Sequence, residues 1–137
     1  MFRIAILVLS LCCTLLYSAL SQAELLVTQA TVRLLPPGVP NTAAYFTIEN
    51  TSKQPVYLIG AQASFVNKAE IHNHVHHEGM MKMQQQDEVK LEAGQTVQFA
   101  PGGLHLMLFG LNKPLTEDQL LELSVQTKSG LSVSFKA

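Results

Sequence analysis

Histidine and methionine side chains are concentrated in two short segments of this sequence. The first, EIHNHVHHEGMMKM over residues 70–83, holds four of the five histidines and three of the five methionines. The second, GLHLMLFG over residues 103–110, holds the remaining histidine, His105, with Met107 two positions later. Imidazole nitrogen and thioether sulfur both bind metals, and the soft, uncharged sulfur is a poor ligand for hard cations. The two segments together therefore predict one soft-metal site.

Copper, and Cu(I) above all, is the metal that this combination of side chains favours. Zinc sites draw on thiolate, imidazole and carboxylate, and calcium or magnesium requires several oxygen ligands. Taken singly, each methionine would be interpreted as core filler and each histidine as solvated surface. All five histidines and four of the five methionines, however, lie between His72 and Met107. Packing alone does not account for that concentration.

The expected framework is a set of short strands separated by turns. Apolar and β-branched runs predict strands at residues 43–48, 56–61, 69–75, 96–100, 104–109, 121–126 and 131–135. Segments rich in proline, glycine and asparagine lie between them. This spacing favours an antiparallel sandwich or barrel. One short helix is predicted at residues 116–121, with Thr116 as its cap and Gln119 three positions later.

The first segment has the pattern of a β-hairpin. If residues 69–77 form a strand, alternate side chains share a face. Glu78-Gly79 then predicts a tight turn into a returning strand, with His77 opposite Met80. In that register one face of the hairpin carries His72, His74, His76, Met81 and Met83.

The second segment has the pattern of a half-buried strand. Leu104, Leu106 and Leu108 alternate with His105 and Met107. The leucines would face the core, which leaves the imidazole and the thioether together on the other face. The Pro-Gly-Gly turn just before them places this pair near the end of the sheet, where access is easy.

Composition bounds the class of protein. A chain of 137 residues has room for one domain. Its net charge is −1 and only 14% of its residues are charged. No basic field is available to bind nucleic acid.

Residues 1–23 predict a secretory signal peptide, followed by one domain over residues 24–137. A positive start and an apolar stretch precede Ser21 and Ala23, small residues three positions and one position before the expected cut. The rival interpretation is an uncleaved membrane anchor. The apolar run is short for that role and is interrupted by polar residues, whereas a span needs roughly 20 residues.

The two cysteines, Cys12 and Cys13, both lie within the predicted signal peptide. Lipidation at either is disfavoured, because almost no apolar segment would precede the modified residue. The mature chain then has no cysteine, so any metal must be held without thiolate. A blue-copper electron-transfer site, which needs a cysteine ligand, is excluded.

The spacing of four residues resembles the H-x10-M-x21-H-x-M signature of the periplasmic Cu(A) copper chaperone (PCuAC) family. His72, Met83, His105 and Met107 fit it without a gap. The surrounding words AEIH, GMMKM and PGGLHLMLFGLNKPL are also similar to the family. The resemblance covers essentially the whole mature chain. It implies an all-β fold, a single cupredoxin-like antiparallel β-sandwich, that binds one Cu(I) through these four residues near its surface.

The resemblance also implies a function. Members of the family deliver copper in the periplasm toward the Cu(A) centre of cytochrome c oxidase, alone or with a thioredoxin-like copper protein. The chain is thus expected to be a periplasmic metallochaperone without enzymatic activity and without stable membrane insertion after signal cleavage. Three further histidines depart from the family pattern and predict either secondary Cu(II) binding or a second ion: His74, His76 and His77.

Two alternatives from other classes remain open at this point. One is a secreted copper enzyme with a nitrogen-rich site built from His72, His74, His76 and His105. The other is a β-sandwich interaction module that binds no metal and whose histidines are incidental.

Overall fold

The computed structural model describes residues 25–137, and every regular element in that part of the chain is a β-strand. The strands are β1 (Leu25–Val32), β2 (Asn41–Asn50), β3 (Val56–Ala63), β4 (Val66–His77), β5 (Met80–Gln85), β6 (Val89–Leu91), β7 (Thr96–Phe99), β8 (His105–Leu111), β9 (Glu122–Thr127) and β10 (Ser132–Lys136). The signal-peptide prediction falls on residues 1–23, outside the described residues. Within 25–137 no helix is long and apolar enough to cross a membrane.

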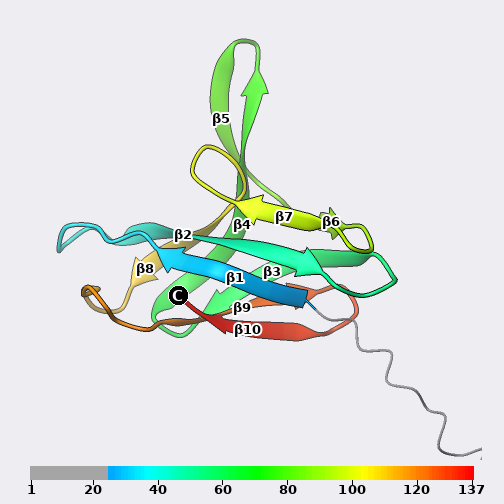
Figure 1. The fold of residues 1–137 in the computed structure, drawn as a ribbon. Coiled ribbons are helices and arrows are strands. Elements are labelled where there is room, and N and C mark those ends of the chain that lie inside the picture. Colours follow the sequence, from blue (N-terminus) through cyan, green and yellow to red (C-terminus); the bar gives the residue numbers. More distant parts are fainter. Residues whose placement is uncertain (1–24) are drawn as a thin grey trace, which may run out of the picture.

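All strand pairs are antiparallel. The main path of the sheet runs β1-β2-β8-β4-β3-β9-β10, while β5, β6 and β7 pair with β4, β3 and β2. The sheet curls so that β1 and β10, at its two ends, lie close together (Figure 1). The all-β antiparallel prediction is confirmed.

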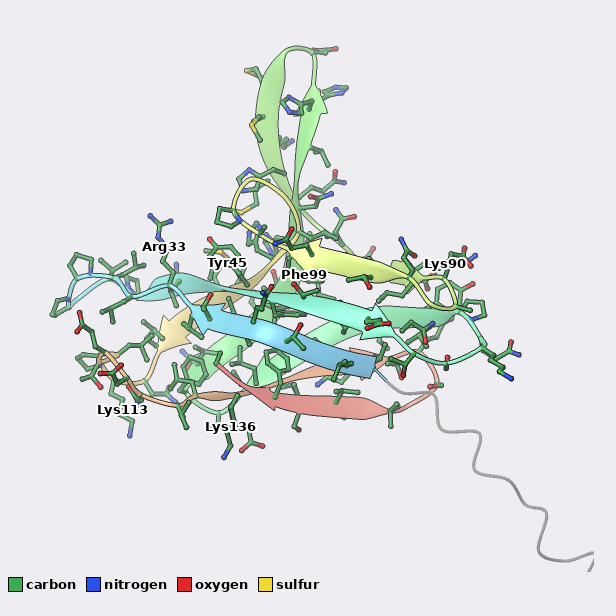
Figure 2. All side chains as sticks on the ribbon, in the orientation of Figure 1. Arg33, Tyr45, Lys90, Phe99, Lys113 and Lys136 are labelled. Atoms are coloured by element: carbon green, nitrogen blue, oxygen red, sulfur yellow. The ribbon has the colours of Figure 1, made fainter. Side chains whose placement is uncertain are left out.

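The core fills the space between the two curved halves of the sheet. Phe46 of β2 stacks on Phe99 of β7 with ring centroids 4.4 Å apart, and Phe135 of β10 lies 4.8 Å from Phe46. Charged side chains such as Arg33, Lys90 and Lys136 lie on the outside (Figure 2). Besides Phe46 and Phe99, the large, fully buried apolar side chains are Ile48, Leu58, Ile71, Leu91, Leu106, Leu108, Leu123 and Val125. Their burial supplies most of the free energy that holds the strands together.

All seven strands predicted from apolar runs are present, with ends shifted by a few residues, but β1 and β6 were missed. In β1 the pairing register with β2 shifts between Thr28 and Thr31, and Gln29 has a positive φ of 55°. Such a bulge breaks the two-residue alternation by which a strand is recognised. Strand β6 is three residues long, too short to show a period.

The predicted helix at residues 116–121 was wrong. This segment is a turn without helical structure. Asp118 has a left-handed φ of 58°, which a right-handed helix cannot contain. The expected local contact still forms, since the Thr116 N–H donates to Gln119 Oε1 at 3.2 Å.

The hairpin of β4 and β5 projects from the sandwich (Figure 1). The first part of β4 pairs with β8 and the last part with β5. At the tip both Glu78 (φ 51°) and Gly79 (φ 78°) have positive φ, as a type I′ turn requires. His77 pairs with Met80, so the predicted turn and register are confirmed.

Candidate metal centre

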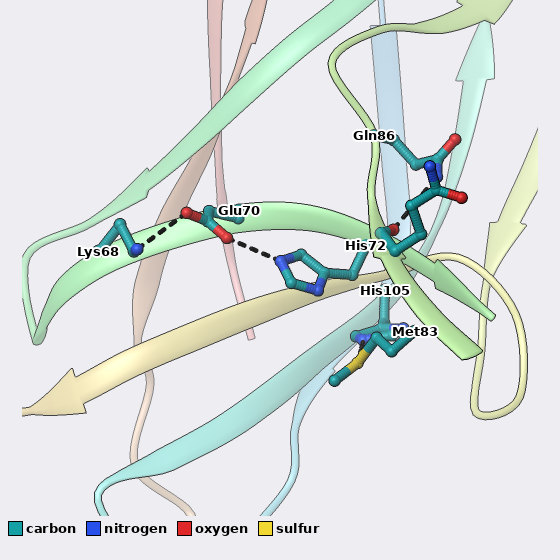
Figure 3. A network of polar contacts seen from close by, with 7 residues as sticks. Lys68, Glu70, His72, Met83, Gln86 and His105 are labelled. Carbon is teal, nitrogen blue, oxygen red and sulfur yellow. Dashed lines mark hydrogen bonds and ion pairs between the residues drawn. The ribbon is translucent and has the colours of Figure 1, made fainter.

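The base of the hairpin brings the two histidine and methionine segments together. His72 on β4 pairs with His105 on β8 on one side and with Gln85 on β5 on the other. Directly paired residues project to the same face of the sheet. His105, which pairs with His72, and Met83, which pairs with His74, therefore lie on the same face as His72. The side chains of His72, Met83 and His105 therefore converge where the hairpin leaves the sheet (Figure 3).

His105 is held in one orientation and one tautomer. Its side chain is only 4% exposed, although it lies on the opposite face of β8 from the core leucines. Its Nδ1–H donates to the Gly103 carbonyl at 2.9 Å, which leaves the lone pair on Nε2. That Nε2 lies 3.2 Å from the Sδ of Met83 (Figure 3). Two lone-pair atoms facing each other so closely are arranged as ligands of a shared cation.

The electrostatic environment favours the neutral form of His105. Burial lowers the pKa of His105 below its usual value, and the nearby His74 and His72 lower it further. The bond to the Gly103 carbonyl acts in the opposite direction and raises the pKa, but it does not reverse the shift. A neutral imidazole is the form that binds metals, so the site is prepared for a ligand role.

His72 is oriented by a carboxylate. The Glu70 Oε2 atom lies 2.7 Å from His72 Nε2, and Lys68 Nζ lies 3.0 Å from the other carboxylate oxygen (Figure 3). These hydrogen bonds, from His72 first and then from Lys68, lower the pKa of Glu70. The ionised carboxylate accepts the Nε2–H, which leaves a lone pair on Nδ1. That Nδ1 is buried and has no hydrogen-bond partner.

Both histidines thus share one arrangement. Each donates one ring N–H to an oxygen atom, the carboxylate of Glu70 or the carbonyl of Gly103, and keeps the other nitrogen free. Metal-binding histidines typically show this pattern, because the outer partner fixes the ring and raises its basicity. An unpartnered buried nitrogen costs stability unless something binds it. The residues present therefore fit a soft metal ion.

The two methionines differ in exposure. Met83 is 44% exposed on β5. Met107 is half-buried on β8, where it pairs with Glu70 of β4 and Ala43 of β2. It lies two residues from His105 and so on the same face of the strand. Three of the four residues predicted as ligands meet at the hairpin base, and the fourth shares their face.

The additional hairpin histidines differ in how closely they approach this group. The His74 ring lies 5.3 Å from the His105 ring, and the His72 ring lies 5.9 Å from it. His76 and His77 are exposed toward the tip. Within residues 25–137 no group of three or more His, Cys, Asp or Glu side chains is placed to hold a metal. At the hairpin base the thioether of Met83 lies beside the His105 imidazole.

Sequence reasoning missed Glu70 and Gly103. Both stand two residues before a histidine, Glu70 before His72 and Gly103 before His105. In a strand that spacing puts side chains on one face, so the sequence could have predicted that Glu70 lies beside His72. Gly103 acts through its backbone carbonyl, which side-chain patterns do not reveal.

Comparison with known proteins places this site in a family. Residues 25–137 match the family model described as "Putative lipoprotein LpqE-like". The chain belongs to the LpqE-like family. A Leifsonia xyli relative, Lxx21020, whose name carries the same lipoprotein description, is 31% identical over 105 residues, 76% of this chain and 62% of the relative. An uncharacterized Rickettsia prowazekii protein, RP573, is 35% identical over 72 residues, 52% of this chain and 40% of that protein. The chain therefore matches less than two thirds of the length of either relative.

Solved structures similar to this LpqE-like chain include PCuAC domains. The copper-bound PCuAC domain from PmoF2 is 19% identical with a TM-score of 0.69, covering 83% of this chain and 90% of that one. The Cu(I) form of DR1885 from Deinococcus radiodurans is 27% identical with a TM-score of 0.68, covering 91% and 83%. The cupredoxin-like fold and the likeness to PCuAC proteins are thereby confirmed. Both of these neighbours are copper-bound.

Proposed function

We propose that this protein is a copper chaperone that binds one Cu(I) and passes it to an acceptor protein. The ligands in this proposal are His72 through Nδ1, His105 through Nε2, and the thioether sulfurs of Met83 and Met107. The observation that carries it is the 3.2 Å approach of His105 Nε2 to Met83 Sδ, with the other ring nitrogen already bound to an oxygen.

The donor set favours the monovalent ion. All four ligands are uncharged, and two are thioether sulfurs, which select Cu(I) over harder ions. The ionised Glu70 sits behind His72 and not at the metal, so it balances the charge of the ion without adding a hard ligand. Any Cu(II) affinity would come from the imidazoles of the hairpin, as a secondary property.

Release is built into the position of the ligands. Met83 is partly exposed at the hairpin base while His105 is buried. A ligand from the partner protein can therefore displace the Met83 thioether first. It then binds the ion before the two histidines dissociate. Copper then passes between proteins without becoming free in solution. A carrier of this kind needs no catalytic base or nucleophile.

The acceptor in this proposal is the Cu(A) site of a cytochrome c oxidase subunit, reached alone or through a thioredoxin-like copper protein. Its place of action is the periplasm, after cleavage of a signal peptide at residues 1–23 leaves a domain of residues 24–137. The lipoprotein description of the LpqE-like family supports a location outside the cytoplasm.

Binding and transfer are tested separately. In anaerobic competition with a chromophoric Cu(I) chelator, H105A and M83L should weaken binding strongly, while M80L on the opposite hairpin face should not. Cu(I)-loaded protein is then mixed with a metal-free Cu(A) domain, the two are separated, and copper is counted on each.

Copper should move to the Cu(A) domain, and adding a small amount of chelator should not intercept it. Copper that stays on the donor, or that the chelator captures fully, would contradict the chaperone function. Multiple turnovers of an oxidase or dismutase assay by the copper-loaded protein would favour the enzyme alternative instead.

A further inference from the structure

The hairpin of β4 and β5 continues the histidine and methionine pattern beyond the site described above. On one face, His74 pairs with Met83 and His76 pairs with Met81. Each of these pairs sets an imidazole directly across from a thioether, with side chains close enough to share a ligand. The hairpin face thus carries successive His–Met pairs from its base toward its tip.

The exposed fraction of the side chains rises from the base of the hairpin toward its tip. His105 at the base is 4% exposed, Met83 is 44% exposed and Met81 is 53% exposed. His76 is also exposed. Large thioether side chains in water gain nothing from packing, so their position on the projecting hairpin calls for another role.

His74 connects the outer pair to the base. Its ring lies 5.3 Å from the ring of His105. It is also two residues from His76 on the same face of β4. An ion held near the tip by His76 and Met81 would therefore have His74 as its nearest ligand on the side of the main site.

We propose that the hairpin face holds a second, weaker Cu(I), bound by His74, His76 and Met81, from which copper passes to the main site. The inference rests on the proposed function, because it takes the main site as a Cu(I) site. Cu(I) accepts few ligands, and these three are uncharged and soft. This position is more exposed than the main site and has one sulfur ligand fewer. It therefore binds Cu(I) more weakly, and copper moves from it to the main site.

The opposite face of the hairpin provides an internal control. It carries one more His–Met pair, His77 and Met80, of the same composition and closer to the tip. His77 Nε2 lies 3.9 Å from Glu78, and Met80 is 71% exposed. Because neighbouring residues on a strand project to opposite faces, this pair points away from His74. If composition alone decided, Cu(I) would bind at both His76–Met81 and His77–Met80. The proposal predicts Cu(I) binding only at His76–Met81.

Methionine methyl resonances distinguish these cases directly. The protein is labelled at its methionine methyl groups and titrated anaerobically with Cu(I) while NMR spectra are recorded. Up to one equivalent, the Met83 and Met107 methyls should shift. Between one and two equivalents the Met81 methyl should shift, and the Met80 methyl should stay in place. Movement of Met80 and Met81 together would overturn the proposal, as would saturation at one equivalent.

Paired variants give a second readout. H76A/M81L should lose the second equivalent in a Cu(I) chelator competition and keep the first, while H77A/M80L should keep both. Loss of the second equivalent in both double variants would overturn the proposal. A second ion that appears only with Cu(II) and leaves the Met81 methyl unshifted would also overturn it. Failure of the first, tight step in the wild type would instead contradict the proposed function, so the two failures are distinguishable.

Discussion

The Nε2 atom of His105 faces the Sδ atom of Met83 across 3.2 Å, although the two residues lie on separate strands. Their meeting depends on two independent registers, that of β4 with β8 and that of β4 with β5. A shift of one residue in either register would turn one of the side chains to the other face. The site is therefore a consequence of how β4 pairs on both of its edges.

Replacing Met83 with leucine should separate metal binding from folding. The change conserves volume and removes the sulfur. Because Met83 is 44% exposed, the free energy of unfolding of the metal-free protein should change by less than about 0.5 kcal/mol. Cu(I) affinity should fall by more than the roughly 10- to 100-fold that loss of an outer partner costs, because Met83 is a ligand in this proposal. Chelator competition measures the affinity and urea unfolding the stability. An unchanged affinity in M83L would remove Met83 from the ligand set.

Glu70 should act on copper through His72. Replacing it with glutamine removes the ionised acceptor of the His72 Nε2–H and frees Lys68. Loss of such an outer partner typically weakens metal binding by about 10- to 100-fold. The matched control is E88Q, because Glu88 forms an exposed ion pair with Lys128 away from the hairpin. Equal Cu(I) affinities of E70Q and E88Q would show that Glu70 does not support the site.

The stability of the metal-free protein should depend on pH through His105. Burial lowers the pKa of His105 in the folded state, whereas in the unfolded chain it is about 6.5. The unfolded state then binds more protons below about pH 6.5, so the free energy of unfolding should fall as pH drops from there to the folded pKa. Glu70 adds little to this pH dependence above about pH 5, because its pKa is lowered and its carboxyl is ionised there in both the folded and the unfolded state.

Urea unfolding of the wild type and of H105Q across this pH range checks the prediction. The H105Q protein should show a shallower decline. If both proteins lose stability in parallel, His105 is not the group responsible. Cu(I) affinity should weaken over the same range, since protons compete with the metal for the imidazoles.

The hairpin turn should matter for copper more than for the fold. A Cβ added at Gly79 would meet nothing within 4 Å, so G79A acts through its positive φ of 78° alone. The strain should cost about 1 to 2 kcal/mol and disturb the register that places Met83. Gly94 has a similar φ of 74° and the same open surroundings in the turn before β7. G94A should therefore lose similar stability and keep its Cu(I) affinity. A loss of affinity in both variants would mean that the hairpin has no special role.

Much of the site was predictable because it depends on local patterns. The alternation of histidines, the Glu78-Gly79 turn and the methionines beyond it predict the hairpin and its register, and the structure has both. The leucine alternation around His105 likewise predicts which face the imidazole takes. These features need only the two-residue period of a strand and the φ demands of a short turn.

Contacts that depend on the assembled fold were not predictable. That His105 is buried on an outward face follows from its contact with Met83 of the hairpin and with the Gly103 carbonyl, which no single segment reveals. The free Nδ1 of His72 follows from its contact with Glu70, whose choice of partner depends on side-chain rotamers. The bulge at Gln29 in β1 broke the period that identifies strands.

X-ray absorption at the copper edge of the protein loaded anaerobically with less than one equivalent of Cu(I) tests the central claim most directly, because it counts the neighbours of the ion by element. The account predicts two sulfur and two nitrogen neighbours, with one sulfur lost in M83L and one nitrogen lost in H105A. A wild-type spectrum with nitrogen and oxygen neighbours only, or one unchanged by both substitutions, would contradict it.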